Sequence, residues 1–317
     1  MEKPKAGIVG AGISGASCAG ALSAAGWDVD VFDKGHGAGG RLASRCLESG
    51  WATLGAPFIS AWNTPFREQA EEWVKKGWVA PLKGDILQGR ADTGWTQARL
   101  KGHYLPKIET SELVRHVMGQ AKLHLESHVI AVQPQTLVFQ DGSMADGYDQ
   151  VICAVPGPQA ISLLDALSPL RERLAGVRYR PVWAFLMRCE GGPDADIIKF
   201  DDNLLDMAVR QTTADPDLWL VHSSYEFAES HVEASEIEAR TRAAAALMDL
   251  LGLSRPVEVE ASHMWLYARS ENPVGGHWLR DDENRVILIG DGISGAGVER
   301  AWESGVQLAQ AILESKV

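Results

Sequence analysis

A glycine-rich turn near the start of the chain constrains its fold more than any other feature. Residues 6–15 read Ala-Gly-Ile-Val-Gly-Ala-Gly-Ile-Ser-Gly, and small residues continue to Gly26. A second apolar stretch over residues 29–32 then ends at Asp33. Strand, glycine turn, helix, strand and acid in this order form a dinucleotide-binding unit of about 30 residues.

Each glycine of the turn has a separate predicted task. Gly10 allows the tight turn after the strand, Gly12 lets the backbone approach a pyrophosphate, and Gly15 lets the helix pack closely on the strand. The pyrophosphate would lie at the helix N-terminus, where free N–H groups and the helix dipole favour negative charge. Asp33 would accept hydrogen bonds from a ribose diol. The alternative is a glycine-rich turn that binds no ligand.

Length, charge and cysteine content exclude several classes of protein. A chain of 317 residues is long enough for about two domains. The net charge of −12 argues against nucleic-acid or membrane partners, because both favour a basic face. The 4 cysteines show no CxxC spacing, so neither a disulfide framework nor a metal site is expected. With a first strand at about residue 6 and no long apolar run, we expect a soluble cytoplasmic protein.

Apolar periodicity and turn signals predict the elements between the two ends of the chain. Asp141-Gly142 indicates a hairpin, and residues 263, 265 and 267 alternate, so that His263, Trp265 and Tyr267 share one face of a strand. Helices are predicted over 65–76, 112–120 with residue 110 or 111 as its cap, 159–167 and 234–251. Strands are predicted over 78–82, 95–100, 123–125, 128–132, 137–139, 148–155, 181–188, 206–210, 218–222 and 257–268.

The C-terminal region repeats the pattern of the N-terminal one: an apolar strand, then glycines and an acidic residue, then a helix. Residues 285–290 form an apolar strand that ends in Gly290, and Asp291 follows. More glycines lead into a helix predicted over 298–313. An acid and the amides of a helix N-terminus are thus again expected beside one ligand.

Both ends together resemble FAD-binding flavoproteins of the amine-oxidase-like class, and the whole chain resembles the renalase family, particularly its bacterial members. The matching blocks are 33–34, 39–42, 54–58, 154–160, 265–269, 290–291, 298–299 and 301–302. The resemblance implies an α/β fold: a Rossmann-like FAD-binding domain of the amine-oxidase / p-hydroxybenzoate-hydroxylase type with an interleaved, β-sheet-rich α+β substrate domain. The expected FAD-binding domain comprises 1–55, 108–175 and 262–317, and the substrate domain 56–107 and 176–261.

The motifs and the resemblance together predict the cofactor site. Gly39-Gly40-Arg41 would place amides and a guanidinium near the pyrophosphate, with a surface charge as the alternative for Arg41. Asp291 would bind the ribityl chain, and Val129 would contact adenine through its backbone. The predicted cofactor-binding residues are Gly10, Ala11, Gly12, Ile13, Ser14, Gly15, Asp33, Lys34, Gly40, Arg41, Leu42, Gly55, Ala56, Pro57, Phe58, Val129, Ala154, Pro156, Trp265, Gly290, Asp291, Gly297 and Val298.

The chain departs from the renalase pattern at Pro57, over residues 102–106, and at Gly292-Ile293. The third departure removes a nearby cysteine that could tether the flavin, so non-covalent FAD is expected. The pocket candidates are aromatic, basic or histidine side chains, for each of which core packing, an ion pair or a strand hydrogen bond is the alternative: Phe58, Tyr104, Trp183, Arg210, Trp219, His222 and Trp265.

Renalase-like activity would take a hydride from dihydronicotinamide isomers of NAD(P)H and reduce O₂ to H₂O₂. Such chemistry needs alignment more than acid–base catalysis, so no catalytic residue is predicted. A flavin amine oxidase or small-molecule desaturase on the same scaffold is the second hypothesis, and a flavin-loaded binding or sensing protein is the third. The partners expected are a small molecule and O₂, with the protein a monomer or weak dimer.

Overall fold

The structure is a computed structural model that describes residues 2–48, 50–84, 86–98, 101–211, 215–283 and 285–315. The chain divides into two compact units, each built from separate stretches of sequence. The first unit comprises Met1–Leu42, Thr110–Tyr179 and Arg269–Val317, and the second comprises Ala43–Glu109 and Arg180–Ala268.

The first unit is built on a six-stranded sheet in the order β10-β2-β1-β14-β21-β20. Neighbouring strands are parallel except β20, which runs antiparallel to β21. Apolar runs such as Val286–Ile289 are buried throughout, as expected of strands covered on both faces. The strands are β1 (Lys5–Val9), β2 (Asp28–Phe32), β10 (Lys122–His124), β14 (Gln150–Cys153), β20 (Trp278–Asp281) and β21 (Val286–Ile289).

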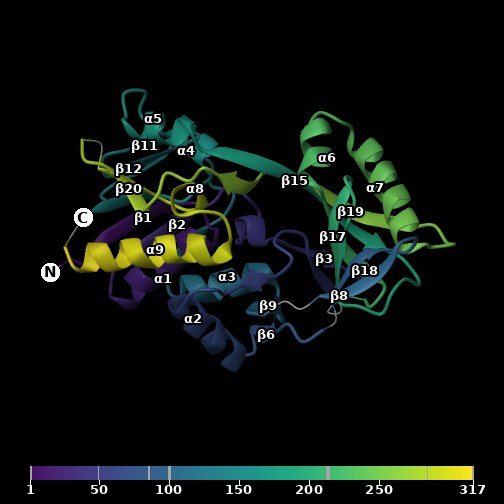
Figure 1. Cartoon of the computed structure of the whole chain (residues 1–317). Helices are drawn as coiled ribbons and strands as arrows, with labels where there is room; N and C mark the ends of the chain where they lie inside the picture. Colours follow the sequence, from purple (N-terminus) through teal and green to yellow (C-terminus); the bar gives the residue numbers. More distant parts are fainter. Residues whose placement is uncertain are drawn as a thin grey trace. The chain divides into compact units, whose positions relative to one another are not determined.

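Helices cover one face of this sheet, and a mixed layer covers the other (Figure 1). The small-residue helix α1 lies against α3 and α9. On the opposite face, Val129 and Leu137 share a core with Ala160 and Leu170. The elements of the two layers are α1 (Ile13–Ala24), α3 (Thr110–Met118) and α9 (Val298–Leu313), and β11 (Val129–Gln133), β12 (Thr136–Phe139), β13 (Met144–Ala145), α4 (Gly157–Leu163) and α5 (Leu170–Ala175).

The second unit is built on a seven-stranded sheet in the order β19-β15-β18-β17-β16-β7-β8. Most of its neighbouring strands are antiparallel, but β16 and β7 are parallel. The strands are β7 (Ile86–Arg90), β8 (Gly94–Ala98), β15 (Arg178–Arg188), β16 (Ile197–Phe200), β17 (Leu205–Arg210), β18 (Leu218–Ser223) and β19 (Glu258–Glu271).

Alternate residues of this sheet reach different layers. Trp183 and Phe185 of β15 pack in the core that includes α7, whereas Ala184 and Leu186 pack against the β3–β4 hairpin. Period-two alternation thus lets one strand serve two cores. The remaining elements of this unit are α6 (Tyr225–Ser230), α7 (Glu236–Leu251), β3 (Ser44–Leu47), β4 (Gly50–Thr53), and a small sheet of β5 (Ile59–Ser60), β9 (His103–Pro106) and β6 (Val79–Pro81) with α2 (Thr64–Lys75).

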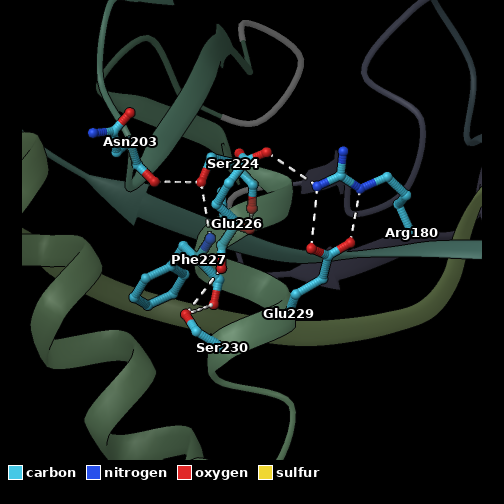
Figure 2. A network of polar contacts seen from close by, with 8 residues as sticks. Arg180, Asn203, Ser224, Glu226, Phe227, Glu229 and Ser230 are labelled. Atoms are coloured by element: carbon cyan, nitrogen blue, oxygen red, sulfur yellow. Dashed lines mark hydrogen bonds and ion pairs between the residues drawn. The ribbon is translucent and has the colours of Figure 1, made fainter.

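A polar network holds the short helix α6 in place (Figure 2). Ser224 caps the helix: its Oγ accepts from Phe227 N at 3.0 Å and donates to Asn203 O. Arg180 donates to Glu226 at 3.0 Å and to Glu229 at 2.8 Å. A six-residue helix is too short to be stable by itself, so these contacts and the buried Phe227 fix it.

The predicted α/β class is correct, but the unit boundaries differ from the predicted domains. Residues 43–55, 108–109 and 262–268 belong to the second unit, and residues 176–179 belong to the first. For residues 43–55 the reason is packing, since Ala52 and Leu54 join the core of the seven-stranded sheet. Thr53 N also donates to Gln211 Oε1 at 2.8 Å. Many elements were not predicted, among them β7, β16, β20, α5 and α8 (Asp291–Ser294). Residues 99 and 100 of the predicted strand 95–100 lie outside the described residues.

Glycine permits close contact between α1 and α9. A Cβ built on Gly305 would lie 2.2 Å from both Ser14 O and Ser17 Oγ. We therefore expect Gly305→Ala to lower the free energy of unfolding by about 1–3 kcal/mol, measured by denaturant titration. The matched control is Gly37→Ala, because a Cβ there meets no described atom within 4 Å. Equal stability of the two variants would contradict the packing argument.

Candidate functional site

The β1–α1 turn leaves backbone N–H groups of α1 open. Gly10 has a φ of +108°, a value that favours glycine, and its N–H donates to Phe32 O at 2.8 Å. Gly12 is the N-cap of α1, and no described side chain caps this helix. The first turn of α1 contains no acidic residue either. The positive end of the helix dipole is therefore not neutralised by the helix itself.

Gly12 and Gly15 are glycine for different reasons. A Cβ on Gly15 would lie 2.1 Å from Gly10 O, so close packing of helix on strand requires glycine there. Gly12 has a φ of −78°, which any residue adopts, and a Cβ on it would meet no described atom within 4 Å. Neither the backbone nor protein packing thus explains Gly12, whereas a ligand lying against the turn would.

A buried hydroxyl group beside this turn also fits a ligand. Ser14 lies in the first turn of α1 and is 4% exposed, yet its Oγ has no hydrogen-bond partner among the described residues. Buried hydroxyls are normally paired, because an unpaired one costs about 1–3 kcal/mol. A phosphate oxygen would satisfy Ser14 Oγ and the open amides together. The residues of this turn therefore fit a dinucleotide pyrophosphate.

Asp33 fixes the same turn from the end of β2. Its Oδ2 accepts from Ala11 N at 2.8 Å and its Oδ1 from Gly35 N at 2.8 Å. Each carboxylate oxygen has more than one acceptor site, so both can also accept from ribose hydroxyls. The sequence predicted only the ribose role, and the structural role of Asp33 in the turn is an additional one.

Arg41 and Asp291 form a bidentate ion pair although 250 positions separate them in the chain. The two N–O distances are 2.6 and 2.7 Å, and the Asp291 side chain is 5% exposed. Arg41 is thus paired with a nearly buried carboxylate and is not an isolated surface charge. Tyr179 lies beside this pair, with its ring centroid 6.0 Å from Arg41 Cζ.

The C-terminal motif begins two more helices with glycine, and each has an acidic residue in its first turn, Asp291 in α8 and Glu299 in α9. Gly290 has a φ of +124° and precedes α8, and Gly297 has a φ of +109° and precedes α9. A glycine N-cap has no side chain that could accept from the first N–H groups of either helix. A Cβ on Gly290 or Gly297 would meet no described atom within 4 Å. The remaining cofactor candidates of this unit vary in exposure: Leu42 and Val129 are buried, Ala154 follows β14, Pro156 caps α4, and Lys34 is exposed.

In the second unit, two predicted residues hold one segment. Trp265 Nε1 donates to Leu54 O at 2.9 Å, and His222 Nε2 lies 3.1 Å from Gly55 O. Burial lowers the pKa of His222 from 6.5 to about 4, so the ring is neutral at pH 7 and its Nε2–H donates to the carbonyl. Side chains from β18 and β19 thus hold the start of segment 54–58 in position. His222 is a hydrogen-bonded strand histidine, which was the alternative to a pocket role.

Several other pocket candidates lie in cores. Trp183 and Trp219 are buried in the core that includes α7, which agrees with core packing, the alternative to the pocket role. Tyr104 is buried and donates to Glu71 at 2.7 Å. Phe58 packs edge-on against His103, at 4.8 Å between ring centroids. The predicted shared face of β19 is confirmed by the 4.2 Å contact of the His263 and Trp265 rings.

Arg210 stacks on Trp219 with its Cζ 4.2 Å from the ring and donates to the carbonyls of Pro193, Ala195 and Pro216. It also lines a cavity of about 220 Å³ within the second unit. The lining includes Pro57, Lys83, Lys107, Asp196 and Gln211. Arg210 was a pocket candidate with a surface ion pair as the alternative, and in the structure its guanidinium makes carbonyl and ring contacts.

The pH dependence of stability should report the buried His222. Its folded-state pKa of about 4 lies below the unfolded value of 6.5, so the unfolded chain binds more protons between these values. This contribution to stability is complete above pH 6.5 and is lost as pH falls toward 4. We expect His222→Gln to remove about 2 kcal/mol of the stability difference between pH 7 and pH 5, measured by denaturant titration at both pH values. An unchanged pH dependence would show that His222 is protonated normally.

Comparison with known proteins places this geometry in context. A family model described as an NAD(P)-binding Rossmann-like domain matches residues 8–73, the stretch that includes the glycine turn, Asp33 and Arg41. The match agrees with the open N-terminus of α1 as a dinucleotide-binding feature. With respect to membranes, the helices within the described parts of the chain are all too short or too polar to span a bilayer.

Solved structures with similar folds cover nearly the whole chain. A provisionally assigned protoporphyrinogen oxidase from Exiguobacterium sp. 255-15 matches with a TM-score of 0.74 at 12% identity, over 99% of this chain and 100% of that one. An oxidoreductase from Methanosarcina mazei matches with 0.74 at 14% identity, over 98% and 100%. Putrescine oxidase bound to putrescine matches with 0.69 at 13% identity, over 99% and 99%. At these identities the likeness shows that the chain shares its fold with these proteins.

Proposed function

We propose that this chain is an FAD-dependent oxidoreductase that binds FAD non-covalently in its first unit. The observation that carries the proposal is the β1–α1 turn, where Gly12 has no conformational or packing reason to be glycine and Ser14 Oγ is buried without a described partner. The likeness in fold to three oxidoreductases supports the same conclusion.

Different residues of the first unit would bind different parts of FAD. The α1 amides and Ser14 would bind the pyrophosphate, together with Arg41, and Asp33 would bind the ribose. Asp291 would accept from the ribityl hydroxyls, and the Gly297–Val298 amides at the N-terminus of α9 would face the flavin pyrimidine. The predicted cofactor contacts of Gly55, Ala56, Pro57, Phe58 and Trp265 remain predictions.

FAD supplies a ring that accepts a hydride from a bound substrate. The task of the protein is then to bind, to align and to exclude water, and none of the residues described above is proposed as an acid or base. His222 fits this division, because its pKa of about 4 makes it a poor proton donor or acceptor near neutral pH. We assign it and Trp265 to holding residues 54–58 in position.

For the substrate, we propose dihydronicotinamide isomers of NAD(P)H, with O₂ as acceptor and H₂O₂ as product, as in the renalases that the sequence resembles. An amine substrate is the second candidate, and the likeness in fold to putrescine oxidase bound to putrescine favours it. The departures at Pro57 and Gly292-Ile293 also support this alternative.

An anaerobic experiment separates the candidates. Purified protein is mixed with borohydride-generated NAD(P)H isomers, and the flavin absorbance is followed by stopped flow. We expect rapid bleaching, followed by recovery and peroxide formation when air is admitted. Bleaching only with an amine panel would contradict the first substrate and favour the second. Bleaching by neither would favour a binding or sensing protein, and denatured protein that releases no FAD would contradict the proposal itself.

Gly12→Val should separate cofactor binding from folding. A valine there meets no described protein atom at its Cβ and needs no unusual φ, but it would occupy the space proposed for the pyrophosphate. We expect loss of FAD, measured by absorbance after desalting, with the unfolding free energy of the FAD-free protein lowered by only about 1 kcal/mol, the cost of an apolar residue at an N-cap. The contrasting variant is Gly15→Ala, which should destabilise the fold because of the 2.1 Å approach to Gly10 O. Full FAD occupancy in Gly12→Val would refute the assignment.

A further inference from the structure

A buried hydroxyl group of α9 bridges the ends of strands β20 and β21. The register of this antiparallel pair matches Trp278 with Ile289, so one further step would place His277 opposite Gly290. Ser304 lies between these two residues. Its Oγ accepts a hydrogen bond from Gly290 N at 2.8 Å and donates one to His277 O at 2.5 Å. The Ser304 side chain is 0% exposed, so its hydroxyl, and not solvent, satisfies both backbone groups.

The inserted hydroxyl sets the direction in which the chain leaves β21. A backbone pair in a ladder is joined by one N–H···O=C bond of about 2.9 Å, whereas a hydroxyl in the same place joins the two groups through two bonds in series. A hydroxyl can do so because it has one proton and two lone pairs. The strand ends are thereby separated, and Gly290 turns away with a φ of +124°, which favours glycine. Asp291 follows directly after this turn.

A second serine holds the other side of Asp291. Ser270, near the end of β19, is 5% exposed, and its Oγ donates to Asp291 O at 3.0 Å. The two serines come from different elements, and neither was a predicted site residue. Together they fix the backbone before and after the Asp291 side chain, while Arg41 binds the carboxylate itself. The orientation of this carboxylate is therefore determined by its backbone as well as by its ion pair.

The position of Ser304 is in turn fixed by the packing of α9 on α1. Gly305, the next residue, lies so close to α1 that a Cβ on it would be 2.2 Å from Ser14 O. Ser17 Oγ of α1 lies 2.9 Å from Trp302 O of α9. Ser304 therefore connects the helix proposed to bind the pyrophosphate with the turn that carries the acid.

We propose that Ser304 is a positioning residue of the cofactor site, and that Ser270 assists it. The Ser304 hydroxyl takes the place of one backbone bond at the end of the β20–β21 pair, and it thereby places the Asp291 carboxylate for the ribityl chain. The inference rests on the proposed function, because it assigns Asp291 to FAD. It goes beyond that function by naming two side chains that act through the backbone of Gly290 and Asp291.

The first experiment compares two ligands. FAD would reach both the α1 turn and Asp291, whereas ADP, which forms one half of FAD, would reach only the α1 turn and Asp33. Apoprotein is titrated with FAD, followed by quenching of flavin fluorescence, and separately with ADP, followed by calorimetry. In Ser304→Ala, Gly290 N and His277 O lose their partner. We expect the dissociation constant of FAD to rise at least roughly tenfold and that of ADP to change by less than about twofold.

The matched control is Ser168→Ala. Ser168 is also buried, at 4% exposed, and its Oγ donates to Asp281 Oδ2 at 2.5 Å. Asp281 pairs with Val286 at the other end of the same two strands, away from Gly290. This variant should lower the melting temperature while both dissociation constants stay at their wild-type values. Ser304→Ala that binds FAD like the wild type, or that loses FAD and ADP affinity to the same extent, would overturn the proposal.

Two further variants complete the test. Ser304→Cys retains a weak donor and acceptor, so its dissociation constant for FAD should lie between those of the wild type and Ser304→Ala. It also replaces Ser304→Ala if the alanine variant does not fold, and a wild-type affinity for FAD would then contradict the proposal. Ser270→Ala should weaken FAD binding and spare ADP binding, and an unchanged affinity for FAD would overturn the part assigned to Ser270. Wild-type protein that binds no FAD would refute the proposed function itself, which distinguishes that failure from one confined to the serines.

Discussion

The first unit depends on one helix that is packed at backbone distance on three sides. The Cβ of an alanine at Gly15, Gly20 or Gly305 would lie 2.1–2.2 Å from a backbone oxygen of β1's turn, α3 or α1 respectively. Most residues of α1 from Ile13 to Ala19 are buried, and nearly all of them are small. Such contact leaves little freedom in the position of α1. Its N-terminus, where the open amides and Ser14 Oγ lie, is therefore held fixed by the same packing that stabilises the unit.

An ion pair connects two segments that lie far apart in the sequence. Arg41 comes from the segment after β2 and Asp291 from the segment after β21, and their bidentate pairing with nitrogen–oxygen distances of 2.6 and 2.7 Å aligns both. A nearly buried carboxylate is costly unless it is paired and hydrogen-bonded, and Asp291 is both. Tyr179 and the glycine at position 292 complete its surroundings. The cluster unites a cation and an anion at the site proposed for the cofactor.

The candidate residues of the second unit show where inference from sequence was limited. Alternation in β18 puts Trp219 in the core with α7 and turns His222 toward the hairpin side, where it meets Gly55 O. The alternation along a strand shows which residues share a face. When other elements pack on both faces of the sheet, it does not show which element packs on which face. Trp183 and Trp219 were therefore equally good candidates for core and pocket until the position of α7 was known. Trp265 was distinguished by its motif, and its indole holds Leu54 O.

The sequence by itself determined the class of fold, the β1–α1–β2 unit, and the C-terminal strand and helix. It also determined that the glycine turn at the start of α1 has the residues of a dinucleotide-binding motif. These follow from local rules, because glycine spacing, apolar runs and an acid after a strand act within about 30 residues. The tertiary structure decided the rest. It moved residues 43–55 to the second unit, gave Asp33 a structural role and paired Arg41 with Asp291. It also brought Tyr179 against Gly292, a contact between residues over 100 positions apart that depends on packing volume and carries no local signal.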